Sequence, residues 1–189
     1  MINNFDTNNT ENKKKTLPMT FRIEKNIMNK LKDEAQSQDV SINTLLNHIL
    51  KKYVEWDVFM PKIGMIPISK PIIIEVFKKL NDNDIADIAI VGKNTVMDMA
   101  LFMKGKLNVQ TFLSWYGARL KNSCIEVRHS EDIENQIYAI KHDLGINWSK
   151  YHKKLLELIF KEIFKQSIEI EMSDTTLVFR SKNSDAPIT

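Results

Sequence analysis

The sequence holds a single cysteine, Cys124, which excludes an intrachain disulfide framework and fits a reducing cytoplasm. No apolar run is close to the length of about 18 residues that a membrane-spanning helix needs. The first residues, MINNFDTNNTENKKK, lack the hydrophobic core of a signal peptide. We therefore expect a cytoplasmic protein without a membrane partner.

Catalytic and metal-binding patterns are also scarce. The sequence has no Gly-rich phosphate loop, no GxSxG motif, and no paired CxxC or HExxH motif. Its carboxylates form no supported acid/base pair. The spacing of the four histidines, with Cys124, matches no metal site, so we interpret them as surface and helix-capping residues. They are His48, His129, His142 and His152. The sequence thus predicts no enzyme, no catalytic residue, no metal and no cofactor.

The composition is typical of a globular chain, with 43% hydrophobic and 27% charged residues. The formal net charge is only +3, so basic residues matter where they are concentrated. One such concentration is Lys13, Lys14 and Lys15, which follow a polar, Asn-rich arm at residues 1–12. We expect that arm to be disordered.

Residues 19–23 alternate between apolar and polar side chains, which predicts a short β-strand with Thr20 and Arg22 on its polar face. Pro18 has no backbone N–H to donate and marks the start of the strand. A single unpaired strand of this length is not stable by itself, and the next two segments are helical. We therefore expect it to pair with the same strand of a second copy across a two-fold axis.

Two amphipathic segments follow. Ile27, Leu31 and Ala35 recur at helical spacing, and a second apolar stripe runs over residues 42–56. Between the segments, Asp39 tolerates a left-handed or turn conformation, and Ser41 is a good N-cap for the second helix. One strand and two short helices cannot enclose a core alone, whereas two interlocked copies can.

This order of elements resembles the ribbon-helix-helix family of DNA-binding proteins over residues 13–57, about the first third of the chain. The family often has glycine in the turn where this sequence has Asp39, and often has a base-reading side chain near Pro18. The residues that carry the resemblance are the alternating MTFRI, the apolar Ile27, Met28 and Leu31, and the turn QDVS before Ile42, Leu45, Leu46 and Ile49.

The resemblance implies an intertwined homodimer that places an antiparallel β-ribbon in the major groove of double-stranded DNA. Base contacts would come from Thr20 and Arg22, with Pro18 beside them, and Arg22 can bond guanine in a bidentate way. The phosphate contacts would come from Lys13, Lys14, Lys15 and from the start of the second helix, Ser41, Ile42 and Asn43.

The remainder of the chain predicts an α+β domain. Prolines and a glycine in residues 58–71 indicate a linker. Along residues 72–182, the predicted elements are helices followed by β-β-α-β-β. This order favours an antiparallel four-stranded sheet covered on one face by helices. The expected elements are strands at 124–129, 136–143, 168–172 and 176–180, and helices at 95–104, 109–121 and 148–166. A further helix, capped by Ser69, is expected to run through Leu80, followed by a turn at Asn81–Asp84. Asn108 is the expected cap of the helix at 109–121. Residues 183–189 are interpreted as a disordered tail.

The sequence leaves the role of this second domain open between oligomerisation and the sensing of a small-molecule effector. Four aromatic residues are candidates for lining a pocket, although their spacing is more typical of a core. They are Trp115, Tyr116, Tyr138 and Trp148.

These observations favour a sequence-specific, DNA-binding transcription regulator that acts as a homodimer or a tetramer, with repression as its default outcome. Two alternatives remain open. One is an antitoxin-like regulator whose C-terminal part neutralises a partner protein. The other is a scaffold that uses its ribbon only to dimerise.

Overall fold

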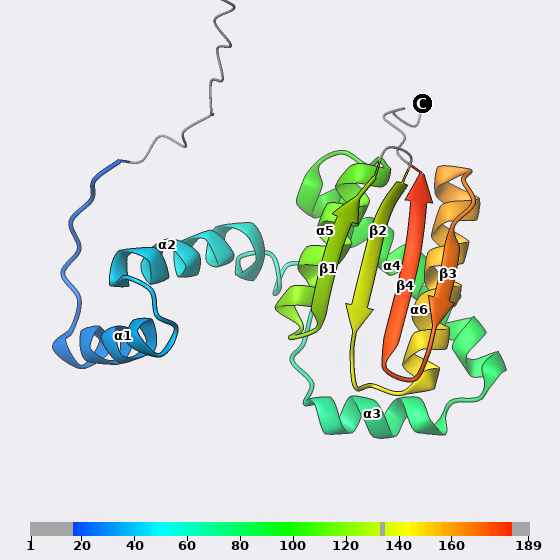
Figure 1. Ribbon diagram of the computed structural model, residues 1–189, viewed down its shortest axis with the longest axis horizontal. Helices are drawn as coiled ribbons and strands as arrows, with labels where there is room; N and C mark the ends of the chain where they lie inside the picture. The colour runs from blue at the N-terminus through cyan, green and yellow to red at the C-terminus, as the bar shows by residue number, and fades with distance from the viewer. Residues whose placement is uncertain (1–16, 133–134, 183–189) are drawn as a thin grey trace, which may run out of the picture. The chain divides into compact units, whose positions relative to one another are not determined.

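The computed structural model describes residues 17–132 and 135–182. The chain divides into two compact units, with the boundary between Asp57 and Val58. The N-terminal unit is helical, and the C-terminal unit combines helices with one antiparallel sheet (Figure 1). Every described strand belongs to the C-terminal unit, so the fold is α+β with its strands late in the chain.

The N-terminal unit contains α1 (Lys25–Ser37), α2 (Ile42–Lys52) and a π-helical turn, η1 (Tyr53–Asp57). Asp39 lies between the two α-helices with φ 52°, the left-handed conformation that commonly ends a helix. Ser41 then caps α2, because its Oγ accepts a hydrogen bond from the Thr44 amide at 3.0 Å. The predicted turn residue and the predicted cap are both confirmed.

The β-strand predicted at the start of this unit is wrong, and with it the β-α-α beginning of the predicted fold. Residues 17–24 carry no strand, and the first regular element is α1. A strand is held by backbone hydrogen bonds to a neighbouring strand. The four described strands pair only with one another. The alternation of side chains at 19–23 fits an extended backbone, but it supplies no partner for that backbone.

The C-terminal unit places helices before and within a four-stranded sheet. Its elements are α3 (Lys70–Lys79), α4 (Asp82–Lys104), α5 (Val109–Asn122), β1 (Glu126–Glu131), β2 (Asn135–Lys141), α6 (Ile146–Ile159), the π-helical η2 (Phe160–Phe164), β3 (Glu169–Met172) and β4 (Thr176–Lys182).

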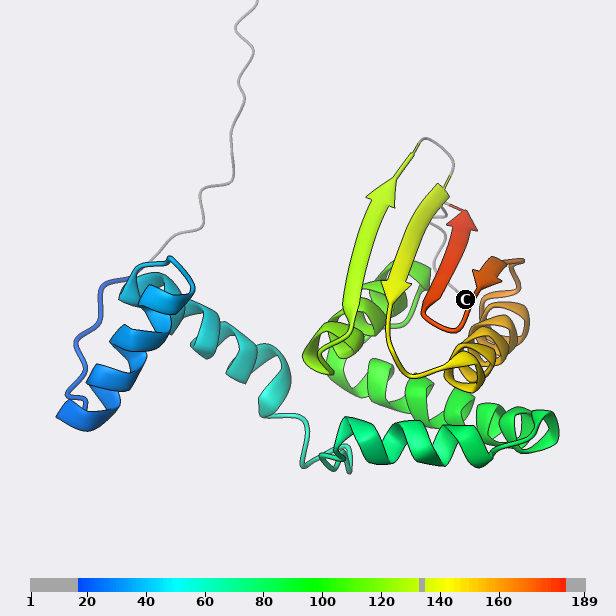
Figure 2. The same cartoon turned by 60° about the horizontal axis from the view of Figure 1, so that its bottom comes forward.

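The sheet has the strand order β1-β2-β4-β3, with all neighbours antiparallel. Along β4, Leu177 and Phe179 are buried while the residues between them are not, so one face of the sheet packs on the core. The helices lie on that face, and the opposite face is free of them (Figures 1 and 2). This half-covered antiparallel sheet agrees with the prediction for the C-terminal part of the chain.

Aromatic side chains fill the layer between sheet and helices. Phe112 of α5 stacks on Tyr116 with ring centroids 5.7 Å apart, and Phe179 of β4 stacks on Tyr138 at 5.0 Å. The four aromatic residues considered for a pocket, Trp115, Tyr116, Tyr138 and Trp148, are all buried. They belong to the core, as their spacing suggested.

Several predicted boundaries differ from the structure, and two of the differences have a clear local cause. The sequence NDND at 81–84 predicts a turn, but it forms the start of a single 23-residue helix, α4. Asn81 caps that helix through a capping box with Asp84, because asparagine and aspartate favour helix N-termini as well as turns. The first strand also begins two residues later than predicted, since Cys124 has φ 58°, which a strand residue cannot adopt.

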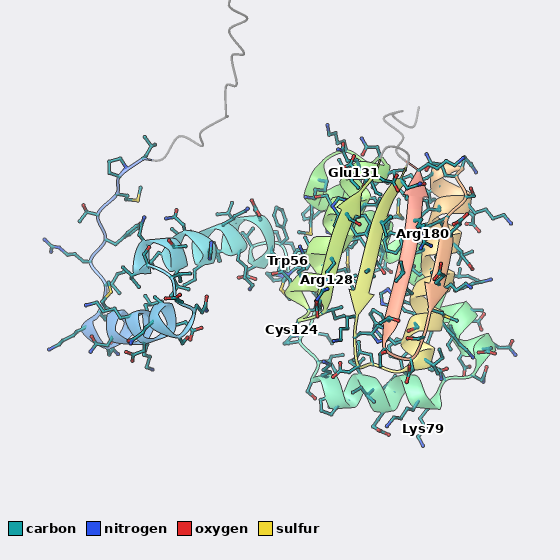
Figure 3. All side chains as sticks on the ribbon, viewed as in Figure 1. Trp56, Lys79, Cys124, Arg128, Glu131 and Arg180 are labelled. Carbon is teal, nitrogen blue, oxygen red and sulfur yellow. The ribbon has the colours of Figure 1, made fainter. Side chains whose placement is uncertain are left out.

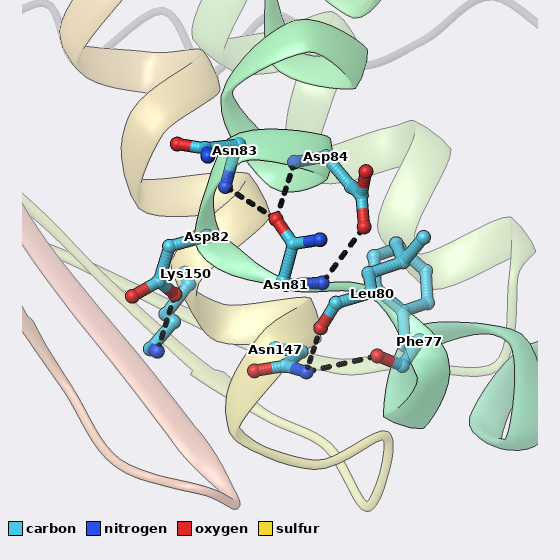
Figure 4. A network of polar contacts seen from close by, with 8 residues as sticks. All are labelled: Phe77, Leu80, Asn81, Asp82, Asn83, Asp84, Asn147 and Lys150. Carbon is cyan, nitrogen blue, oxygen red and sulfur yellow. Dashed lines mark hydrogen bonds and ion pairs between the residues drawn. The ribbon is translucent and has the colours of Figure 1, made fainter.

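A polar junction ties α3 to α6 (Figure 4). The Nδ2 of Asn147 donates to the carbonyl oxygens of Phe77 and Leu80, each at 2.9 Å. Both carbonyls lie at the end of α3, where internal donors run out. The Phe77 carbonyl also accepts from the Leu80 amide, at 3.2 Å. Lys150 of α6 also pairs with Asp82, at 2.6 Å. Asn147 thus holds the end of one helix against the start of another.

Replacing Asn147→Ala should lower the free energy of unfolding by about 1–3 kcal/mol, because the Leu80 carbonyl loses its donor and the Phe77 carbonyl keeps only the Leu80 amide. Chemical denaturation of the full chain measures the change. Asn83→Ala is the matched control, since Asn83 is exposed in the first turn of α4 and should change stability by less than about 0.5 kcal/mol. Equal losses in the two variants would show that the junction contributes nothing of its own.

Candidate functional site

The N-terminal unit buries little of its apolar surface. Among its described residues, only Ala35, Leu45 and Trp56 are buried. Eight large apolar side chains are exposed, from 43% at Ile49 to 90% at Leu17. The others are Met19, Phe21, Ile27, Leu50, Tyr53 and Val54. A unit of about 40 residues rarely folds with so small a core unless something else covers it.

The exposed apolar residues gather in two places. Leu17, Met19 and Phe21 alternate along the extended segment before α1. Near the end of α2, Ile49 and Leu50 are followed one turn later by Tyr53 and Val54, so these four share one side of the helix. We call this set the α2 apolar face. Its side chains are the ones that a partner surface would cover.

The predicted base-contact residues lie in the extended segment. Pro18, Thr20 and Arg22 are all exposed, and they alternate with the apolar side chains of that segment. The structure therefore presents the Thr20 hydroxyl and the Arg22 guanidinium to solvent, where either can form hydrogen bonds with a ligand. Neither side chain is held by a helix or a strand.

The predicted phosphate contacts at α2 lie at the helix N-terminus. The Ser41 hydroxyl satisfies the Thr44 amide, and the Leu45 amide donates to the Ser41 carbonyl at 3.0 Å. The amides of Ile42 and Asn43 precede these bonds and have no acceptor within the helix. They are therefore available to an anion, and the helix dipole favours one there.

The basic arm Lys13, Lys14 and Lys15 lies outside the described residues. Between residues 17 and 57 the sequence has six Lys and Arg and six Asp and Glu, which balance. A positive surplus in residues 13–57 thus comes from the three lysines of the arm. Sequence reasoning did not single out Lys25 and Lys30, which are exposed on α1.

The C-terminal unit contains a polar cluster that the sequence did not reveal. The histidines were interpreted as surface and capping residues, and that interpretation is wrong for His142 and His152, which are 6% and 3% exposed. The Trp148 ring lies against both, with centroid distances of 4.3 Å to His142 and 3.8 Å to His152. His48 and His129 are exposed. Spacing alone cannot show which histidines a tertiary fold will bury.

Hydrogen bonds fix the state of His142. The Ser149 hydroxyl donates to the Ser173 carbonyl at 2.7 Å, so its oxygen is left to accept from His142 Nε2 at 2.8 Å. The Leu144 amide donates to His142 Nδ1 at 3.3 Å. His142 is therefore the neutral tautomer with its proton on Nε2. Its ring links β2, α6 and the turn before β4.

His152 is paired with Tyr116, whose hydroxyl lies 2.5 Å from His152 Nδ1. Burial lowers the pKa of His152 well below its ordinary value, and the nearby Arg119 lowers it further. Burial also raises the pKa of Tyr116 and lowers the pKa of His142. Desolvation disfavours every charged form here, so the cluster stays neutral near pH 7 and supports the core rather than acid/base chemistry.

Other features suited to a ligand are limited. Among the described residues, no group of three or more His, Cys, Asp and Glu side chains could hold a metal ion. An open groove of about 680 Å³ runs along α6 and η2, and it is lined by Lys154, Lys161, Lys165 and Gln166 among others. The four aromatic residues considered for a pocket do not line it.

Comparison with family models, with curated proteins and with solved structures finds no match to this chain. In the parts of the chain that the structure covers, no helix combines the length and the apolarity needed to cross a bilayer. The exposed surface of the N-terminal unit is therefore the feature from which we propose a function.

The buried histidines predict a loss of stability in mild acid. An unfolded histidine takes up a proton near pH 6.5, whereas the lowered pKa values of His142 and His152 keep the folded rings neutral. Their stabilising effect is present above about pH 6.5 and is lost as the pH falls toward the folded pKa values. The free energy of unfolding should therefore drop by up to about 1.4 kcal/mol per pH unit for each ring.

Denaturant titrations between pH 7 and pH 5 measure this slope, in a range above the titration of ordinary carboxylates. His152→Gln should flatten the slope because it removes one titrating ring. His48→Gln, at an exposed site, should leave the slope unchanged. A slope that His152→Gln does not alter would contradict the assignment.

Proposed function

We propose that the chain is a homodimeric, sequence-specific DNA-binding regulator of transcription whose N-terminal unit both pairs with a second copy and contacts DNA. The observation that carries the proposal is the imbalance between three buried residues and eight exposed large apolar side chains in that unit. Such a surface needs a protein partner, because DNA offers mainly charged and polar groups to it.

A second copy of the same chain is the simplest partner. Most soluble assemblies are homo-oligomers, and two-fold dimers are the commonest among them. In such a dimer the α2 apolar face of each copy meets an apolar surface of the other. Each Leu50-sized side chain that becomes buried contributes about 1.5–3 kcal/mol, so a few of them suffice for a stable pair.

The polar side chains of the extended segment then serve as the DNA-contacting group. Thr20 and Arg22 are exposed beside that apolar surface, and an arginine can read guanine through two parallel hydrogen bonds. The free amides of Ile42 and Asn43 and the arm Lys13–Lys15 suit phosphates. The resemblance to ribbon-helix-helix proteins supports this role for the residues that match it. The β-ribbon itself is not part of the proposal.

Two-fold symmetry in the protein implies two related half-sites in the bound DNA. Occupation of such a site would block transcription, so repression is the proposed outcome. The C-terminal unit would strengthen assembly or bind an effector. The compartment that fits this activity is the cytoplasm.

Selection of bound sequences from a random duplex pool, with the full chain at a stated salt concentration, tests the proposal. The wild-type chain should enrich a motif with two-fold symmetry. Arg22→Ala should lose preference at one position of each half-site by about 1–3 kcal/mol, because the bidentate contact is removed. The dimer should survive, since Arg22 lies outside the α2 apolar face.

Arg22→Lys is the matched control, because it keeps the charge and removes only the planar fork. It should retain the overall affinity for random duplex while losing the preference at the same position. A wild-type chain that is folded and dimeric yet enriches no motif would contradict DNA recognition and favour a scaffold. An unchanged motif in Arg22→Ala would exclude base reading by Arg22.

A further inference from the structure

One face of the sheet in the C-terminal unit is not covered by the helices. The helices pack on the opposite face (Figures 1 and 2). Figure 3 labels Arg128 and Arg180, whose side chains lie on the uncovered side. Because side chains alternate along a strand, every second residue of each strand belongs to this outer face.

The strand register arranges the outer face in rows. One row runs Arg128, Ala139, Val178 and Glu171, since each of these residues is paired with the next across neighbouring strands. The adjacent row runs Ser130, Ile137, Arg180 and Glu169. The centre of the face is therefore apolar at Ile137, Ala139 and Val178, which are only half-buried, and it is basic at Arg180 of β4.

Charge is distributed unevenly from edge to edge. The β1 edge of the first row carries Arg128, and the β3 edge carries Glu171 and Glu169. The existing partners of these charges are exposed. Arg128 pairs with Glu126 of its own strand at 2.7 Å, and Glu171 pairs with Arg180 at 2.8 Å. Exposed pairs of this kind contribute little, so they leave both edges available to a new partner.

We propose that this outer face binds the same face of a second copy, with the two-fold axis parallel to the strands. Rotation about that axis places each row of one copy over the same row of the other copy, with the order of its residues reversed. Arg128 of one copy then faces Glu171 of the other, twice, and Ala139 faces Val178. In the second row, Ile137 faces the aliphatic stem of Arg180, and Ser130 faces Glu169. The first row therefore places apolar side chains against each other at its centre and opposite charges at both of its ends. The inference deepens the proposed function, on which it rests, because it assigns the surface through which the C-terminal unit assembles.

The charge pattern excludes the other two-fold arrangement. An axis perpendicular to the strands would stack β1 on β1 and β3 on β3. The acidic side chains Glu169 and Glu171 would then face their own copies, which is unfavourable. A nucleic acid is not favoured as the occupant, because the basic side chains of this face, Arg128, Lys141 and Arg180, are balanced by Glu126, Glu169 and Glu171.

The size of the face limits the strength of the contact. Strands are about 4.8 Å apart and rise about 3.4 Å per residue, so four strands of up to seven residues give a face of roughly 20 Å by 20 Å. Two such faces bury on the order of 1,000 Å² in total, the lower limit of specific interfaces. The contact thus becomes strong only when the N-terminal units already hold two chains together.

Native mass spectrometry of mixed full-length chains tests the proposal. Arg128→Glu alone places like charges at both edge contacts of its homodimer, and Glu171→Arg alone does the same. A pair made of one chain of each kind has opposite charges at both contacts. If each homodimer is weakened about tenfold, equivalent to about 1.4 kcal/mol, the mixed pair should exceed roughly 90% of all pairs in an equimolar mixture at low salt.

The chain that carries both substitutions provides the reciprocal test. Mixed with wild type, it faces like charges at both contacts, so mixed pairs should fall well below the roughly one half that random pairing gives. Two opposite outcomes from the same substitutions cannot arise from altered folding. Lys154→Glu, on α6 and away from the sheet, is the matched control and should pair at random with wild type.

The outcomes separate the two proposals. Random pairing in every mixture would overturn the sheet contact and leave the N-terminal dimer standing. Monomers in every sample, including wild type, would overturn both. An excess of mixed pairs in the first experiment with a deficit in the second supports the sheet contact.

Discussion

The main physical constraint on this structure is that its N-terminal unit buries little apolar surface. Folding must offset a conformational entropy cost of about 1–2 kcal/mol per residue, mainly by removing apolar side chains from water. With Ala35, Leu45 and Trp56 as the buried residues of its described part, this unit removes very few. In the proposed dimer, a second copy supplies the covering surface, and the exposed Thr20 and Arg22 lie beside the apolar side chains that it would cover.

The C-terminal unit satisfies the same requirement by itself. Its helices cover one face of the sheet, and aromatic side chains such as Phe112, Tyr116 and Phe179 fill the layer between them. Its buried His142 is hydrogen-bonded within this unit, to Ser149 and Leu144. What it leaves exposed is the outer face of the sheet, where Arg128 and Glu171 end the row through Ala139 and Val178. The self-association that we propose would thus have a different physical basis in each unit.

Local chemistry made much of this fold predictable. The left-handed Asp39, the Ser41 cap and the Asn108 cap of α5 depend on contacts within a few residues, and all three are present. The order of strands and helix along the C-terminal unit, β-β-α-β-β, followed from alternating segments around one long helix. The strand at 19–23 was not predictable in this way, because alternation specifies an extended chain and says nothing about a partner strand.

Other features were hidden because they depend on tertiary packing. The sequence NDND at the start of α4 suits a turn and a helix N-terminus equally. The packing of the helix that follows decides which of the two forms. His142 and His152 have the same local signature as exposed histidines, and their burial arises from Trp148 and Tyr116 at other positions. The candidate DNA-contacting residues were identified from pattern and resemblance, and among those that the structure describes Pro18, Thr20, Arg22, Ser41 and Asn43 are exposed.

Hydrogen exchange of the backbone amides of α1 and α2, followed as the full chain is diluted, tests most directly whether a second copy completes the N-terminal unit. Protection of these helices should fall with dilution, while protection of the C-terminal unit stays constant. Leu50→Glu should show the low protection at every concentration, and Lys51→Glu, its exposed neighbour on α2, should behave as wild type. Protection of α1 and α2 that is high and independent of concentration would contradict the account, because the unit would then be stable as a single copy.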